Sequence, residues 1–297
     1  MTPTGHPLRV ATRGSRQATA QSNAVAAAIE GATGRPVELV VVETTGDRRA
    51  DVPLHEIGGQ GVFVKEVQRA VLDGRADVAV HSAKDLTSTQ EPGLVIGAIC
   101  TRRTPNDALV GSSLAELADG ATVATGSVRR RAQLAAARPD LRFVELRGNI
   151  DTRLDKLPDG GALVMAVAAL EIVGRTERIA DVLPIERFVP AVGQGSVAVE
   201  CRADDLPTRD ALEAIDDPGT HHAVAVERSF LARLGAGCTM PVGAHVADGV
   251  LHTFLADESL THVHRAALPL DGGQRDHDVA AQAARTAHAA VTTQDNE

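Results

Sequence analysis

The alternation of short β-branched runs with helical segments is the feature that most constrains how this chain can fold. In the first hundred residues, strands are predicted at 8–12, 37–44, 76–82 and 93–99, with helices at 15–31 and 62–74. Ser15 is expected near the start of the first helix and Gly31 just past its end. Buried runs that alternate with helices are typical of α/β proteins with largely parallel sheets.

The same pattern begins again near Arg103. Strands are predicted at 107–110, 121–126 and 142–148, a strand or a strand followed by a helix at 162–170, and helices at 127–138 and 150–157. Pro139 should end the helix before it. A further strand at 196–202 and a helix at 207–216 follow. The sequence therefore indicates a second α/β set.

The pattern changes after Pro218. A helix is expected to end at Gly235, and Asp248 and Gly249 occupy a typical hairpin position between two strand-like runs. A final Ala-rich helix completes the chain. This part of the sequence predicts a small α+β domain with antiparallel strands.

Composition limits the possible functions. The chain has 297 residues, of which 43% are hydrophobic, enough for two or three domains. Only 2% are aromatic, which argues against a protein that stacks the bases of single-stranded nucleic acid on aromatic side chains. The net charge of −9 argues against general nucleic-acid binding. No apolar run is long enough to span a bilayer.

The three cysteines, Cys100, Cys201 and Cys238, form no zinc-binding spacing. An odd number of cysteines and the lack of a secretory signal pattern predict a protein of a reducing compartment, the cytoplasm. Cys238 is unusual because it lies in a Gly/Pro-rich turn, "LGAGCTMPVGAH".

Residues 125–153 are rich in arginine. Seven arginines, Arg129, Arg130, Arg131, Arg138, Arg142, Arg147 and Arg153, face three acidic residues, Asp140, Glu145 and Asp151. Ser127 is a natural N-cap, which places Arg129 and Arg130 in a first helical turn, where the helix dipole disfavours each cation by ~0.3–1 kcal/mol. Either the arginines form a solvated face that tolerates this cost, or a bound anion reverses it.

Polar residues also follow the predicted strands, at the sheet edge where α/β proteins bind ligands. Arg13 and Ser15 follow the first strand, His81 lies at the end of the third, and Lys84 and Asp85 follow the third. Asp85 could cap a helix or pair with Lys84, or it could stay ionised among cations and stabilise a substrate cation. His81 is a general base by residue type, although a structural histidine is commoner. The spacings of phosphate loops, nucleophile elbows and zinc proteases are absent.

Eight stretches between residues 9 and 245 together resemble the porphobilinogen deaminase (hydroxymethylbilane synthase) family. They are "RVATRGSRQA", "GGQGVFVKE", "ADVAVHSAKDL", "TPNDALV", "TGSVRRRAQL", "LRGNIDTRLDKL", "PAVGQGSVAVECR" and "LGAGCTMPVGAH". The resemblance implies two α/β domains like those of periplasmic binding proteins and a small third α+β domain. The implied bounds are 1–100 plus about 196–216, about 103–192 with an arginine-rich cleft face, and about 218–297.

The resemblance also implies an activity. Four porphobilinogen molecules would condense head to tail into linear hydroxymethylbilane, with loss of ammonia, on a dipyrromethane cofactor joined by a thioether to Cys238. Asp85 matches the family's catalytic aspartate, and Gln60 and Phe63 lie in its lid loop. The positions implied to bind cofactor and substrate are Arg13, Ser15, Lys84, Thr125, Ser127, Arg129, Arg130, Arg147, Arg153 and Gln194. No metal is implied, and a monomer without nucleic-acid or membrane partners is expected.

Two positions depart from the family pattern. Ile172 stands where the family has an arginine, so Arg175 could supply that contact, and Gln60 replaces a lysine of the lid loop. Two other functions stay open: a non-catalytic anion-binding protein of the periplasmic type, and a nucleotide-dependent transferase, which the missing phosphate loop disfavours.

Overall fold

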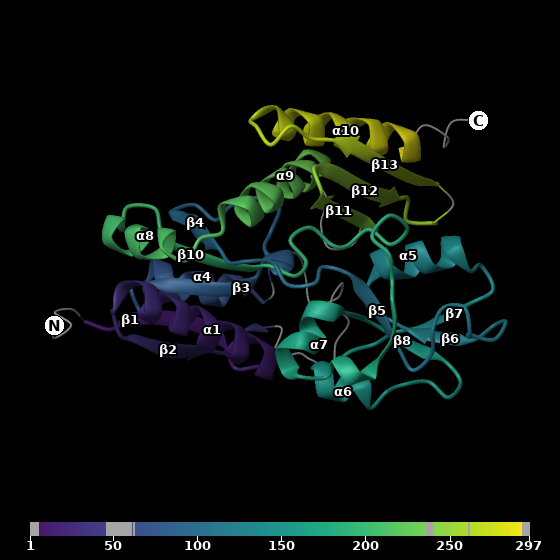
Figure 1. Ribbon diagram of the computed structural model, residues 1–297, viewed down its shortest axis with the longest axis horizontal. Coiled ribbons are helices and arrows are strands. Elements are labelled where there is room, and N and C mark those ends of the chain that lie inside the picture. The colour runs from purple at the N-terminus through teal and green to yellow at the C-terminus, as the bar shows by residue number, and fades with distance from the viewer. Residues whose placement is uncertain (1–5, 46–60, 62, 236–239, 261, 293–297) are drawn as a thin grey trace. The chain divides into compact units, whose positions relative to one another are not determined.

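The structure is a computed structural model that describes residues 6–45, 61, 63–235, 240–260 and 262–292. The chain divides into two compact units, drawn in Figure 1. The first unit holds residues 1–103 and 196–221, and the second holds 104–195 and 222–297.

The first unit is built on one five-stranded sheet. Its strands, in spatial order, are β2 (Val37–Val42), β1 (Leu8–Arg13), β3 (Val78–Ser82), β10 (Val197–Arg202) and β4 (Leu94–Ile99). β1 is parallel to β2 and β3, whereas β10 is antiparallel to β3 and β4. The green β10 therefore lies among purple and blue strands that are distant from it in sequence (Figure 1).

Helices cover both faces of this sheet. α1 (Arg16–Thr33) and α8 (Leu206–Glu213) pack on one face, around Val10 and Val199, and α4 (Lys65–Leu72) packs on the other, around Ala11. Alternate strand residues point to opposite faces, and both faces are covered, so apolar residues dominate the buried positions on both faces.

The predicted end of the first helix was wrong. α1 continues through Gly31, and Gly34, with φ of 68°, ends it by donating its N–H to the Glu30 carbonyl. Gly31 lies on the exposed side of the helix, where a glycine costs only its weak helix propensity. The left-handed conformation that stops the helix is adopted three residues later.

The second unit contains a sheet of the same plan. Its strands, in spatial order, are β7 (Arg142–Val144), β6 (Thr122–Ala124), β8 (Ala162–Ala166), β5 (Asp107–Val110) and β9 (Ile179–Val182). β6 is parallel to β7 and β8, and β5 is antiparallel to β8 and β9. In both sheets the fourth strand in order runs against the other four.

Helices again form the outer layers of this sheet. α5 (Val128–Ala137) packs on one face, and α6 (Ile150–Leu154) and α7 (Val167–Val173) pack on the other. β9 was not predicted, because it is a short edge strand with alternately exposed residues that gives little hydrophobic signal.

The second unit also contains the predicted antiparallel sheet, of β11 (Val242–Ala247), β12 (Val250–Ala256) and β13 (Val263–Pro269). α9 (Pro218–Leu234) and α10 (Arg275–Thr292) share a core with it. Asp248 and Gly249 have φ of 50° and 71°, which confirms the hairpin, and Gly235 ends α9 as expected.

The predicted fold class is confirmed: two α/β sheets with largely parallel strands and one small antiparallel α+β part. No helix within the described ranges is both long and apolar enough to cross a membrane.

Candidate functional site

Four of the predicted site residues lie at one edge of the first sheet. Arg13 ends β1 and Ser15 caps α1 just beyond it, while Lys84 and Asp85 belong to a short 3₁₀ turn, Ala83–Asp85, directly after β3. β1 and β3 are parallel neighbours, so their carboxyl ends meet at this edge. Arg13, Lys84 and Asp85 are each half-buried there.

Phe63 joins this group through Arg13. The guanidinium carbon of Arg13 lies 4.1 Å from the centre of the Phe63 ring, a cation–π contact. This contact holds the arginine over the segment that leads into α4. Gln60, the other predicted lid residue, lies outside the described residues.

His81 is held inside the sheet. Its side chain is buried, with Nε2 3.2 Å from Oε2 of the buried Glu200, an oxygen that also accepts a 2.8 Å hydrogen bond from Gln68 Nε2. A histidine enclosed in this way cannot approach a substrate. The structure favours the structural interpretation of His81 over that of a general base.

The hydroxyl groups at the edge of the second sheet are used within the protein. Ser127 Oγ accepts the N–H of Arg130 at 3.4 Å, which confirms Ser127 as the N-cap of α5. Thr125 Oγ1 accepts the Ser127 N–H at 3.2 Å. Ser15 is likewise the N-cap of α1 in the first unit, where its Oγ accepts the Ala18 N–H at 3.3 Å. These hydroxyls shape the turns that carry the charged groups.

Arg147 and Arg153 lie beside this turn. Arg147 follows β7, and Arg153 in α6 donates from Nε to the Gly148 carbonyl at 2.7 Å. β6 and β7 are parallel neighbours, so the turns that follow them share one edge. They approach so closely that a Cβ on Gly126 would lie 2.7 Å from the Leu146 carbonyl oxygen. The arginines after β6 and after β7 are thus brought to the same edge.

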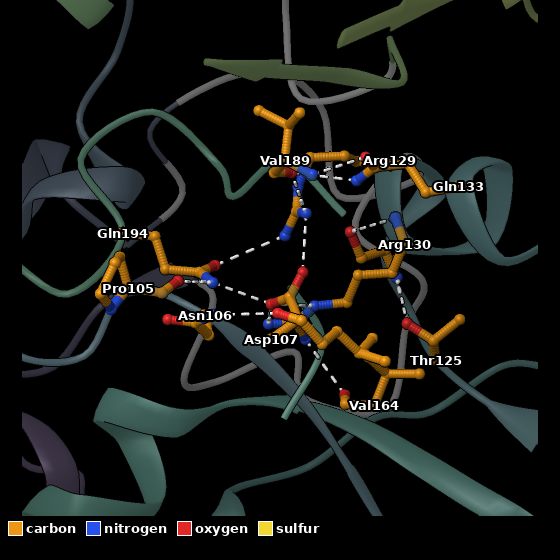
Figure 2. Close-up of polar contacts among 12 residues, drawn as sticks. Pro105, Asn106, Asp107, Thr125, Arg129, Arg130, Gln133, Val164, Val189 and Gln194 are labelled. Atoms are coloured by element: carbon orange, nitrogen blue, oxygen red, sulfur yellow. Dashed lines mark hydrogen bonds and ion pairs between the residues drawn. The ribbon is translucent and has the colours of Figure 1, made fainter. Parts of the chain in front are cut away.

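Arg129 and Arg130 are buried rather than solvated, and Asp107 lies between them (Figure 2). Arg129 Nη1 donates to Asp107 Oδ2 at 2.7 Å, and Arg130 donates to Asp107 Oδ1 from Nε at 3.0 Å and Nη2 at 2.8 Å. The interpretation of these two arginines as a solvated face was wrong. The anion that offsets their position in the first helical turn is a carboxylate of the protein itself.

Gln194 and two carbonyls complete the cluster. Gln194 is 1% exposed, and its Nε2 donates to Asp107 Oδ1 at 2.8 Å and to the Pro105 carbonyl at 2.6 Å. Arg129 and Arg130 also donate to the carbonyls of Val189, at 2.7 Å, and Val164, at 3.1 Å. Figure 2 shows Arg129, Arg130 and Gln194 converging on the Asp107 carboxylate.

The cluster keeps an excess positive charge. Burial disfavours the ionised form of Asp107, but the charges of Arg129 and Arg130 outweigh it and hold the pKa of Asp107 well below its ordinary value. Within the described part of the chain, Asp107 is the sole carboxylate in ion-pair distance of either guanidinium. Two cations and one anion leave one net positive charge, which suits an anionic ligand.

Only two of the three cysteines lie within the described residues. Cys238 lies outside the described residues, between the end of α9 and the start of β11. Cys100 and Cys201 are free thiols, and burial raises the pKa of each to about 11.

One departure from the family pattern is Ile172, which packs against the core of the second sheet. Arg175, which could supply the contact of the missing arginine, has its Nε 3.9 Å from Asp151 Oδ1.

A family model described as porphobilinogen deaminase, dipyromethane cofactor binding domain, matches residues 8–210. The chain belongs to the porphobilinogen deaminase family. The porphobilinogen deaminase of Syntrophobacter fumaroxidans is 43% identical over 289 residues, 93% of this chain and 94% of that one. That of Acidothermus cellulolyticus is 50% identical over 246 residues, 80% of this chain and 74% of that one.

The porphobilinogen deaminase of Thermobifida fusca is 46% identical over 276 residues, 90% of this chain and 83% of that one. Among solved structures, a periplasmic substrate-binding protein from Coxiella burnetii matches with a TM-score of 0.45 and 14% identity, over 74% of this chain and 96% of that one. Because porphobilinogen deaminases are transferases, the alternative of a non-catalytic anion-binding protein is not favoured.

The residues present fit the cofactor of the family. A dipyrromethane built from two porphobilinogen molecules carries carboxylate side chains. Arg129 and Arg130, with Asp107 between them, offer buried cations with a net positive charge. Asp107 is the residue that sequence reasoning missed. The sequence did contain a sign of this role: Asp107 is an acidic residue that begins an apolar strand, and Arg129 and Arg130 are consecutive arginines that need a negative partner when buried.

Proposed function

We propose that this chain is a porphobilinogen deaminase that joins four porphobilinogen molecules head to tail into linear hydroxymethylbilane. Each addition forms a carbon–carbon bond between the aminomethyl carbon of one molecule and a pyrrole α-carbon, and releases the amine as ammonia. The α-carbon loses a proton in the same cycle, and water finally releases the product. Buried arginines with excess positive charge, in the region that matches the cofactor-binding family model, carry this proposal.

Porphobilinogen bears an acetate and a propionate, so a growing product accumulates carboxylates. Within the first unit, Arg13 and Lys84 are proposed to bind such carboxylates. Within the second unit, Arg147, Arg153 and the Arg129–Arg130 pair are proposed to do so. Arginine suits this task because it stays charged and binds carboxylates through two parallel hydrogen bonds. Ser15, Thr125 and Ser127 support these groups by capping and shaping the turns.

Asp85 is the proposed catalytic residue. Positive charge develops on the pyrrole nitrogen of the substrate as ammonia leaves, and a carboxylate that accepts the pyrrole N–H stabilises it. The same carboxylate can take the proton that the α-carbon loses. Its half-buried place after β3, beside Lys84 and on the edge that carries Arg13, supports this role. A dipyrromethane bound through a thioether to Cys238 would supply the α-carbon at which the first substrate is joined.

The first test is the intact mass of the purified protein from a host that makes tetrapyrroles. We expect an adduct of two pyrrole rings on the wild type and none on Cys238→Ser. An unmodified wild-type mass, together with no release of ammonia from porphobilinogen, would contradict the proposal.

The second test is the rate of ammonia release in Asp85→Asn. Loss of charge stabilisation and proton transfer is expected to lower kcat by roughly 10²–10⁴-fold. Asp119→Asn, which neutralises an exposed carboxylate of the second unit, is the matched control and should keep the wild-type rate. An Asp85→Asn rate equal to that control would exclude Asp85 as the catalytic residue.

We also propose that the protein acts as a monomer in the cytoplasm, without a nucleic-acid or membrane partner. Its net charge of −9 and the free thiols of Cys100 and Cys201 support this. Light scattering coupled to size-exclusion chromatography would measure the oligomeric state, and a dimer mass would refute this part.

A further inference from the structure

Arg129 and Arg130 are consecutive on α5, yet both guanidiniums reach the same carboxylate (Figure 2). Consecutive residues on a helix point about 100° apart, and like charges repel strongly in a buried site. Arg131, the next residue, points away from the first two by this spacing and is exposed. Something other than the helix must therefore bring Arg129 and Arg130 together, and the contacts identify it as Asp107.

The topology of the second sheet explains how Asp107 reaches them. Asp107 is the first residue of β5, which runs antiparallel to β8, and it is paired with Ala166, the last residue of β8. The start of the antiparallel strand thus lies at the carboxyl edge of the parallel strands. This edge is where α5 begins after β6.

The surroundings of Asp107 are fixed in turn. Gln194 donates to its Oδ1, and Gly193, the preceding residue, donates its N–H at 2.7 Å to Oε2 of the buried Glu227 on α9. Asp107 itself is 1% exposed. Its two oxygens therefore accept four hydrogen bonds from three side chains that are themselves buried.

We infer that Asp107, held by Gln194, is a positioning residue that brings Arg129 and Arg130 together and sets the net charge of their ligand site at one positive unit. This inference rests on the proposed binding of carboxylates by these arginines. Each guanidinium has five N–H groups, and the contacts within the described residues use three, which leaves two on each for a ligand carboxylate.

The test compares two buried aspartates of the second unit. Asp107→Asn keeps the shape but removes the charge that holds the arginines. Asp276→Asn is the matched control: Asp276 is also 1% exposed, and it pairs with His222 and accepts the Asp271 and Gly272 N–H groups, with no arginine involved. Both variants should lose thermal stability. The decisive measurements, on folded protein, are the fraction carrying the cofactor adduct and the KM and kcat for porphobilinogen.

For Asp107→Asn we expect adduct occupancy below half and at least a tenfold rise in KM, with a smaller change in kcat. Binding of the carboxylates stabilises the ground state and the transition state equally, so losing it raises KM more than it lowers kcat. Asp276→Asn should keep the wild-type occupancy and KM. If folded Asp107→Asn also has wild-type occupancy and KM, the role of Asp107 is only structural and the inference is overturned.

If Asp107→Asn does not fold, Gln194→Met takes its place, because it removes the amide that holds Asp107 without altering the charge of the cluster. A rise in KM of several-fold supports the inference, and unchanged KM and occupancy overturn it. If the wild-type protein carries no adduct and releases no ammonia, both the proposed function and the inference are contradicted. If the wild type is active and the variants match it, only the inference is contradicted.

Discussion

At the scale of single residues, the cysteines differ in chemical availability. The thiolate is the form that reacts with alkylating agents, and burial raises the pKa of Cys100 and Cys201 to about 11. At pH 8, only about one in a thousand of such thiols is ionised. Burial therefore keeps both thiols largely protonated at this pH. Cys238, in contrast, is proposed to be occupied by a thioether.

Folded wild-type protein should therefore react very slowly with iodoacetamide at pH 8. The rate should rise about tenfold per pH unit up to about pH 11, because the folded pKa lies above the working pH. Mass spectrometry of the alkylated protein measures this, and Cys238→Ser should label at the same slow rate. A fast-reacting thiol in the wild type that is missing from Cys238→Ser would show that Cys238 is free.

At the scale of elements, the contact between two neighbouring turns brings the arginines that follow β6 and β7 to one edge of the second sheet. Gly126, between β6 and α5, lies against the Leu146 carbonyl, between β7 and α6. A backbone carbonyl cannot move aside as a flexible side chain can. The absence of a side chain at Gly126 therefore allows the turn before Ser127 to lie against the turn before Arg147.

Gly126→Ala should separate these turns. We expect a loss of about 1–3 kcal/mol in the free energy of unfolding, the usual cost of overpacking, and a higher KM for porphobilinogen. Gly31→Ala is the matched control, because a Cβ there meets nothing within 4 Å and Gly31 is inside α1. That variant should gain about 0.5–1 kcal/mol. Urea unfolding measures both, and equal stability of Gly126→Ala and wild type would contradict the steric argument.

At the scale of the whole molecule, each unit combines segments that are remote in sequence. β10 lies between β3 and β4, so residues 197–202 share a core with residues near the start of the chain. Its immediate predecessors, including Gln194, belong to the second unit. Cooperative unfolding should follow the cores and not the order of the sequence.

Hydrogen exchange of two cavity variants tests this. Val199→Ala, in the core of the first sheet, should speed exchange about 30-fold, equivalent to about 2 kcal/mol, in β1, β3, β4 and β10. β6 and β8 should stay protected. Val164→Ala, in the core of the second sheet, should give the opposite pattern. Equal loss of protection across all strands in either variant would show that the chain unfolds as one unit.

Much of the fold was predictable because hydrophobic periodicity is local. The strands around Val10, Val80 and Leu109, the N-caps Ser15 and Ser127 and the Asp248–Gly249 hairpin follow from neighbouring residues. The end of α1 at Gly34 and the edge strand β9 were missed. Both depend on which residues are exposed in the folded protein, a property that a local pattern does not contain.

The sequence by itself determined the residue types of the candidate site, the family, and the succession of strands and helices along the chain apart from β9. Only the tertiary structure decided that Arg129 and Arg130 are buried, that Gln194 supports them and that Asp107 is their partner. The reason is that β5 runs antiparallel beside β8, which brings Asp107 to the carboxyl edge from a distant part of the chain. Charge pairing across a sheet depends on strand order and direction, which no short stretch of sequence encodes.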